Sequence, residues 1–127
     1  MKKVLLFGAM AFSLMSFTQD TKVMTEEEGM TVINTTTLAQ DVKGYVGTTP
    51  LKIYIKKGKI VKVKALRNKE TPKYFALVKS DVLSKFEGMS TKKAAKAQVD
   101  AATGATLSSR AVIKNVQKGS EYYNKNK

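Results

Sequence analysis

The sequence contains no cysteine, no histidine and no tryptophan, and only 2 prolines among its 127 residues. Without cysteine or histidine the chain cannot form disulfides, ligate an iron–sulfur cluster, attach a c-type haem or build a Ser-His-Asp triad. Nearly all zinc sites are excluded for the same reason. Because few reactive side chains remain, any redox or transfer chemistry would have to be carried by a bound cofactor.

Acidic residues are also scarce: 10 Asp and Glu face 23 Lys and Arg, which gives a formal charge of +13. The length corresponds to one small domain with a basic surface. Lysines alternate with apolar residues over positions 51–65, and such a ladder could contact nucleic acid. Tyr54 is the only aromatic residue on the lysine side, too little for base stacking. We therefore expect a solvated strand face and no nucleic-acid partner.

The first residues resemble an export signal. Lys2 and Lys3 precede an uncharged, mostly apolar run over residues 4–17, and the small residues Ser16 and Thr18 provide a cleavage site. The alternative is a retained membrane anchor. We predict a signal peptide over 1–18, a loosely ordered lead over 19–40, a folded domain over 41–119 and a flexible basic tail over 120–127. The protein would then be secreted across the inner membrane, to the periplasm or cell surface.

The residue pattern of the folded part predicts an α+β fold: a small antiparallel sheet with helices packed on one face. Period-two alternation over 51–65, with Gly58 in the turn, indicates a hairpin. We expect its buried face to hold Leu51, Ile53, Ile55, Val61 and Val63. Residues 45–47 are a candidate preceding strand. Helical spacing predicts one helix from Thr71-Pro72 to Gly88 and a second from about Thr106 to Gly119.

The most informative segment is residues 100–109, which directly precede and open the second helix. It combines small residues with hydroxyls, namely Asp100, Thr103, Gly104, Ala105, Thr106, Ser108 and Ser109. Unpaired backbone amides and the helix dipole at such a terminus stabilise a phosphate. The alternative is an ordinary helix start that Thr103 or Thr106 caps.

This pattern resembles the flavinylation motif of the FMN-binding domain family. That family includes the C subunit of sodium-translocating NADH:quinone reductase and the G subunit of the Rnf complex. Further segments agree in order, at 44–47, 50–51, 57–60 and 70–72, so the resemblance runs from about Gly44 to Gly119. Larger relatives carry a histidine shortly before the Glu-Thr-Pro segment and often a glycine after it, whereas this chain has Asn68 and Lys73 in those neighbourhoods.

The resemblance implies that Thr106 receives FMN through a phosphoester bond, with FAD as donor and a separate Mg-dependent flavin transferase as catalyst. Thr103, Gly104, Ala105, Ser108, Ser109 and Asp100 would form the surrounding cofactor site. Glu70 and Thr71 would lie near the isoalloxazine ring. Their alternative roles are a first-turn helix acid and its cap.

The expected function is an extracytoplasmic flavoprotein that relays electrons between membrane-bound or periplasmic redox partners. It would be an electron-transfer protein rather than a stand-alone enzyme. Two alternatives remain open at this point: a noncovalent FMN carrier or sensor, and a basic, non-catalytic secreted module that binds anionic surfaces.

Overall fold

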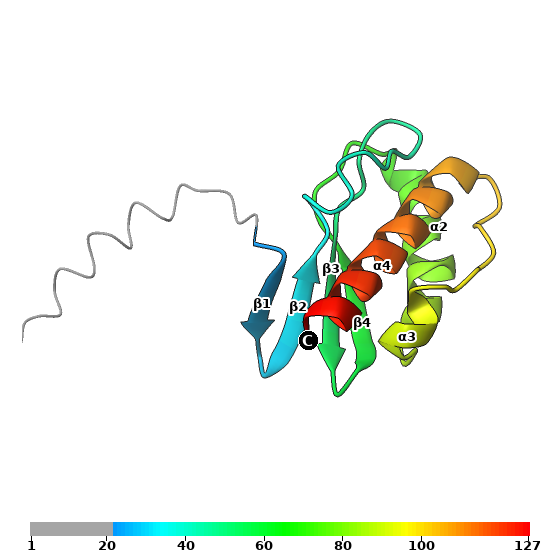
Figure 1. Cartoon of the computed structure of the whole chain (residues 1–127). Coiled ribbons are helices and arrows are strands. Elements are labelled where there is room, and N and C mark those ends of the chain that lie inside the picture. Colours follow the sequence, from blue (N-terminus) through cyan, green and yellow to red (C-terminus); the bar gives the residue numbers. More distant parts are fainter. Residues whose placement is uncertain (1–21) are drawn as a thin grey trace, which may run out of the picture.

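The computed structural model describes residues 22–127, so the predicted signal peptide lies outside the described residues. It confirms the α+β class: a four-stranded sheet carries its helices on one face (Figure 1). The elements are β1 (Met24–Glu27), β2 (Met30–Asn34), β3 (Leu51–Lys56), β4 (Lys59–Ala65), α2 (Pro72–Asp81), the 3-10 turn η1 (Leu83–Phe86), α3 (Thr91–Ala94) and α4 (Thr106–Asn126).

The sheet is an antiparallel meander in the order β1-β2-β3-β4. Its inner face carries Ile33, Ile53 and Ile55 into the main core beneath the helices. The prediction that Val61 is buried was wrong: the register between β3 and β4 shifts beside Tyr54 and Ile55, so Ile60 pairs with Ile55 and is buried instead. Val61 is the extra residue of this β-bulge and is exposed.

The segment before the hairpin is more ordered than its composition predicts. Instead of a loose lead with one strand or a short helix, residues 24–34 form a complete hairpin, and β2 pairs with the central strand β3. Val32 and Ile33 are fully buried there. Threonines and glutamates at the other positions obscured the pattern, because β1 is an edge strand with little buried surface.

Helix α4 crosses the inner face of the sheet and is longer than predicted (Figure 1). Gly119 does not end it: a Cβ at that position would lie 2.5 Å from Ile53 Cδ1, so glycine allows the helix to approach the sheet. The expected flexible tail over 120–127 is helical through Asn126, with Ser120 fully buried. Tertiary packing therefore decides where this helix ends.

The long connection between β2 and β3, residues 35–50, is anchored to α4 by buried polar side chains. The Thr35 hydroxyl donates to Asn115 Oδ1, and Asn115 Nδ2 donates to Thr49 Oγ1 at 3.3 Å. Thr35 Oγ1 also accepts from the Leu51 amide at 2.9 Å. The predicted strand over 45–47 is absent, since these residues form a loop closed by an isolated bridge between Lys43 and Thr48.

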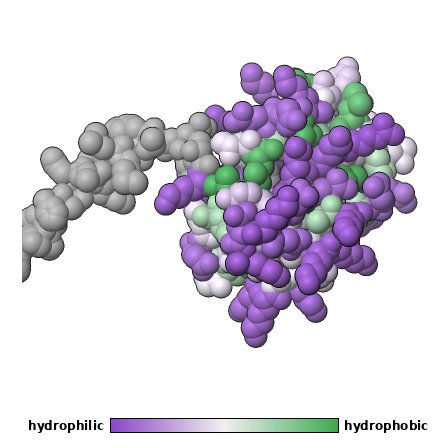
Figure 2. All heavy atoms as spheres, in the orientation of Figure 1, coloured by the Kyte–Doolittle hydropathy of each residue, from purple (hydrophilic) through white to green (hydrophobic). Residues whose placement is uncertain are grey.

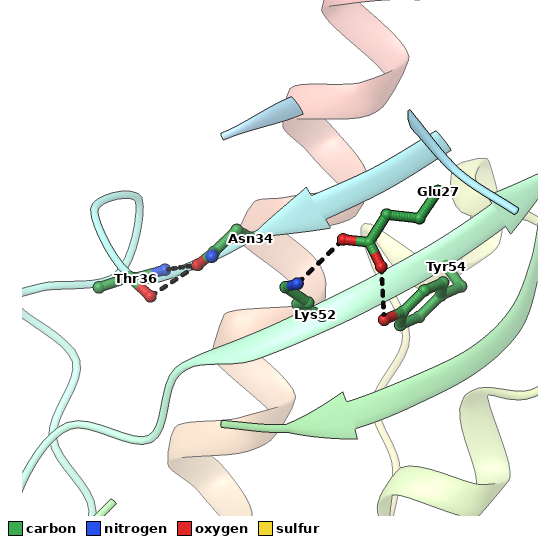
Figure 3. Close-up of polar contacts among 5 residues, drawn as sticks. All are labelled: Glu27, Asn34, Thr36, Lys52 and Tyr54. Atoms are coloured by element: carbon green, nitrogen blue, oxygen red, sulfur yellow. Dashed lines mark hydrogen bonds and ion pairs between the residues drawn. The ribbon is translucent and has the colours of Figure 1, made fainter. Parts of the chain in front are cut away.

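On the outer face of the sheet, Tyr54 is buried rather than exposed, contrary to the simple alternation. Glu27 accepts hydrogen bonds from Lys52 Nζ at 2.9 Å and from the Tyr54 hydroxyl at 3.2 Å, and Figure 3 shows the three side chains converging. Lys62 Nζ lies 4.6 Å from the centroid of the Tyr54 ring. The lysine ladder is thus partly neutralised and covers a tyrosine.

Hydrophilic residues dominate the face seen in Figure 2, with hydrophobic residues limited to small patches. Over residues 22–127, no helix has the length and apolar character needed to cross a bilayer.

Candidate functional site

The start of α4 presents unpaired backbone donors. Ala105 is the N-cap residue, and no side chain caps the helix, so neither Thr103 nor Thr106 plays the capping role considered from the sequence. The first backbone bond is made by the Ser109 amide, which donates to the Ala105 carbonyl at 2.9 Å. The preceding amides have no intrahelical acceptor, as at any helix N-terminus, and the helix dipole adds positive potential there.

A cavity of about 410 Å³ opens against this helix start. Its walls come from three parts of the chain, the 45–47 loop, the beginning of α2 and the segment leading into α4; they are Tyr45, Thr71, Tyr74, Gly104, Ala105, Thr106, Leu107 and Ser108. This volume lies within the range typical of small-molecule sites. The helix terminus and the cavity therefore form one site.

Three large side chains in the cavity walls expose apolar surface that is not buried within the fold. Tyr45 is 74% exposed, Leu107 is 52% exposed and Tyr74 is 47% exposed. Tyr54 on the sheet is comparable in size but only 5% exposed. Exposed aromatic residues gathered in one concavity are typical of a site that takes a flat, partly apolar ligand.

The carboxylate of Glu70 connects the three parts of the chain that form the cavity walls. It accepts backbone hydrogen bonds from Tyr45 at 2.8 Å, Val46 at 2.7 Å and Gly47 at 3.0 Å. The hydroxyl of Ser108, in the first turn of α4, donates to the same carboxylate. Glu70 is 5% exposed and immediately precedes Thr71, the N-cap residue of α2.

Burial alone would raise the pKa of the Glu70 carboxyl. The hydrogen bonds from Ser108 and from the amides of Val46, Tyr45 and Gly47 outweigh burial, so the pKa is lowered from its ordinary value. Glu70 is therefore a buried carboxylate stabilised by neutral donors. It is not a helix acid in the first turn of α2, and its oxygens already have partners.

The structure separates the residues predicted for the site into two groups. Those that line the cavity are Thr71, Gly104, Ala105, Thr106 and Ser108. Thr103 and Asp100 are exposed outside its lining. Ser109 is fully buried, and its hydroxyl accepts from the Ala102 amide at 3.0 Å. Ser109 therefore closes the segment leading into the helix, and Thr106 is left with an exposed side chain on the cavity wall.

Sequence reasoning did not identify Tyr45, Tyr74 and Leu107 as parts of the site. Tyr45 lies in the candidate strand over 45–47, and Tyr74 and Leu107 lie in the two predicted helices, where helical spacing favours burial. A usable signal was the position of Tyr45 between Gly44 and Gly47, in a segment too short to bury an aromatic ring.

The sequence profile of the FMN-binding domain matches residues 44–121, which includes every residue that lines the cavity. The chain belongs to the FMN-binding domain family. No curated protein matches it. Membership of this family makes the chain an FMN-binding flavoprotein. The hairpin of β1 and β2 lies before the matched region.

The cavity suits FMN on the chemistry of its walls. A phosphate or phosphoester fits the unpaired amides at the start of α4, and the flat ring system fits the apolar surfaces of Tyr45, Tyr74 and Leu107. Lys73 Nζ lies 5.9 Å from the centroid of the Tyr74 ring, which places a cation beside one aromatic wall. The FMN-binding domain thus offers separate walls that would hold the phosphate end and the ring end of the ligand.

Proposed function

We propose that this FMN-binding domain carries FMN covalently, through a phosphoester to the Thr106 hydroxyl, and relays electrons outside the cytoplasm. The observation that supports this most strongly is the position of Thr106. It is the first residue of α4, its side chain is exposed, and it lines the cavity beside unpaired amides. Serines 108 and 109 use their hydroxyls within the fold, whereas no capping bond occupies Thr106.

Attachment would be a phosphoryl transfer from FAD, catalysed by a separate Mg-dependent flavin transferase. The Thr106 hydroxyl oxygen forms the bond to the phosphorus on the FMN side of the diphosphate. The bond to the bridging oxygen breaks, AMP leaves with that oxygen, and the hydroxyl proton is released to the transferase or to water. The product keeps one negative charge at the helix terminus, where the dipole and amides of α4 stabilise it.

When bound, FMN supplies the electron chemistry, and the chain supplies position and surroundings. Tyr45 and Tyr74 would flank the ring, and Leu107 would exclude water from its edge. The chain lacks histidine and cysteine, so the usual ring-attachment residues for a covalent flavin are absent and a hydroxyl is the available anchor. The apolar run after Lys2-Lys3 supports export, which would bring the domain to membrane-bound or periplasmic redox partners.

The test is the intact mass of the protein after co-expression with an active flavin transferase. Wild type should gain the mass of one FMN unit, and the flavin should stay with the chain after denaturation and filtration. Thr106→Val keeps the shape and branching of the side chain but removes the attacking oxygen, so it should gain none. Thr103→Val is the matched control outside the cavity, and it should retain covalent flavin at reduced yield.

Flavin that leaves wild type on denaturation would make the protein a noncovalent FMN carrier and would refute the covalent link. Covalent flavin on Thr106→Val would place the attachment elsewhere.

A further inference from the structure

We propose that Glu70 is the positioning residue of the flavin cavity: its carboxylate fixes the Tyr45 loop and the first turn of α4 relative to each other. The inference deepens the proposed function and rests on it for the identity of the ligand. It also changes the role of Glu70 from the one that the resemblance implies. Glu70 does not line the cavity, whereas segments that it holds do.

On the loop side, the carboxylate accepts hydrogen bonds from three consecutive backbone amides. Its Oε1 accepts from Tyr45, and its Oε2 accepts from Val46 and Gly47. The loop has no strand partners to define its shape apart from the single bridge between Lys43 and Thr48. Gly44 makes this contact possible, because a Cβ there would lie 2.5 Å from Glu70 Oε1. The exposed ring of Tyr45 is therefore held by a group behind the loop.

On the helix side, Oε1 also accepts from the Ser108 hydroxyl. Ser108 is buried and lies two residues after Thr106, within the same turn of α4. The third wall follows directly in sequence, since Thr71 is the N-cap residue of α2 and Tyr74 lies in the first turn of that helix. One carboxylate thus sets the distance between the aromatic walls and the hydroxyl that would receive FMN.

The arrangement specifically requires a carboxylate. Each of its two oxygens accepts two hydrogen bonds. A glutamine has one oxygen and one NH₂ group. Its NH₂ would face either the amides of Val46 and Gly47, which only donate, or the Tyr45 amide and the Ser108 hydroxyl, of which only the hydroxyl can also accept. Glu70→Gln therefore keeps the size of the side chain but leaves at least one loop amide without its acceptor. The matched control is Glu87→Gln, because Glu87 is exposed and lies outside this site.

The first experiment is amide hydrogen exchange on the flavin-free protein. In Glu70→Gln at least one of the amides of Tyr45, Val46 and Gly47 loses its acceptor and should exchange about tenfold faster, the factor expected when a charge-assisted hydrogen bond is lost. All three loop amides should exchange at the wild-type rate in Glu87→Gln. Unchanged exchange at the three loop amides would overturn the inference, whatever the flavin result.

The second experiment measures the flavin itself in loaded protein. Tyr45→Leu provides the reference, because removing that ring should raise FMN fluorescence without disturbing the fold. Glu70→Gln and Gly44→Ala should raise fluorescence to a similar level, and Ser108→Ala should raise it less, because the three loop amides keep their acceptor. Wild-type fluorescence in Glu70→Gln would show that the carboxylate stabilises the fold without positioning the cavity.

The two conclusions can fail separately. Failure of wild type to take up FMN would refute the proposed function, while hydrogen exchange would still decide the role of Glu70 in holding the loop. If Glu70→Gln does not fold, Ser108→Ala and Gly44→Ala still test the contact from its two sides. Normal fluorescence in both of those variants would overturn the inference.

Discussion

The cavity end of the molecule and the outer face of the sheet are built from similar side chains with opposite outcomes. On the outer face, Glu27, Lys52 and Tyr54 satisfy one another, and Lys62 covers the Tyr54 ring (Figure 3). At the cavity end, Tyr45 and Tyr74 remain exposed.

The two glutamates make the same contrast. The Lys52 hydrogen bond is the largest influence on Glu27 and lowers its pKa, at a carboxylate that is still partly open to water. Glu70 reaches a lowered pKa although burial opposes it, and its partners are neutral. The comparison teaches that side chains whose partners lie within the chain serve the fold, and those left unused around a cavity indicate a ligand.

The largest expected contrast is between two tyrosines. Tyr54→Ala should lower the free energy of unfolding by about 3 kcal/mol, because it empties a buried position, and should leave FMN uptake unchanged in the folded fraction. Tyr45→Ala should change stability by less than about 0.5 kcal/mol. It should weaken noncovalent FMN binding about fivefold through loss of aromatic contact. Urea denaturation and FMN titration measure the two effects. Equal effects of both variants on FMN binding would break the comparison.

The next contrast is between the glutamates. Glu70→Gln should lower the free energy of unfolding by about 2 kcal/mol, since it removes charge-assisted hydrogen bonds of a buried carboxylate and leaves at least one partly buried loop amide without its acceptor. Glu27→Gln should lower it by less than about 1 kcal/mol, because solvent screens a partly exposed ion pair. Chemical denaturation at neutral pH gives both values. A larger loss at Glu27 would mean that the outer-face cluster carries more of the stability than its exposure indicates.

Acidic pH should also change the stability difference between wild type and Glu70→Gln. A carboxylate with a lowered folded pKa contributes stability above its unfolded value, near 4.5, and loses it as the pH falls through the folded pKa. The stability difference between wild type and Glu70→Gln should therefore be constant above about pH 5 and should shrink below pH 4.5.

Salt should separate the two glutamates. At 1 M salt the Glu70 difference should persist because its partners are neutral, whereas the smaller Glu27 difference should fade. Denaturation curves at several pH values and two salt concentrations test this. A Glu70 difference that grows in acid would reverse the sign and contradict the lowered pKa.

The smallest expected effect concerns the lysines. Lys73 lies beside the aromatic wall, whereas Lys62 lies on the outer face of the sheet. Lys73→Gln should slow oxidation of the reduced flavin by ferricyanide about twofold at low ionic strength, since a nearby cation attracts the anionic oxidant. Lys62→Gln should leave this rate unchanged. Stopped-flow traces at 10 mM and 200 mM salt measure it, and an effect of Lys62 equal to that of Lys73 would place the flavin near the wrong face.

Local signals in the sequence predicted the parts of the fold that depend on neighbours in sequence. Pro72 and Thr106 begin their helices as predicted, and the hairpin around Gly58 forms. The sequence did not predict the parts of the fold that depend on contacts between residues far apart in the chain. Gly119 is typical of a helix end, and only its packing against Ile53 explains why it lies inside α4. Residues 24–34 become a hairpin only because β3 offers them a partner.

The candidate site divides in the same way. Thr106 and its loop were predictable, because a hydroxyl-rich segment before an amphipathic stripe is a local pattern. The role of Glu70 was not, since its donors lie 23 to 25 residues earlier and 38 residues later in the chain. Tyr74 and Leu107 have helical spacing that favours burial, and only the packed structure shows their exposed surfaces.

The order of the elements along the chain also determines how much of the chain the cavity requires. Every strand pairs with its neighbour in sequence, so all the strand partners lie within the first 65 residues. The cavity needs walls from residues 45, 71–74 and 104–108, and α4 must reach back across β2 and β3 to place the last of them. The helix start that carries the Thr106 hydroxyl therefore comes late in the chain, after every strand of the sheet. The complete sheet alone does not form the FMN cavity, because two of its three walls follow residue 65.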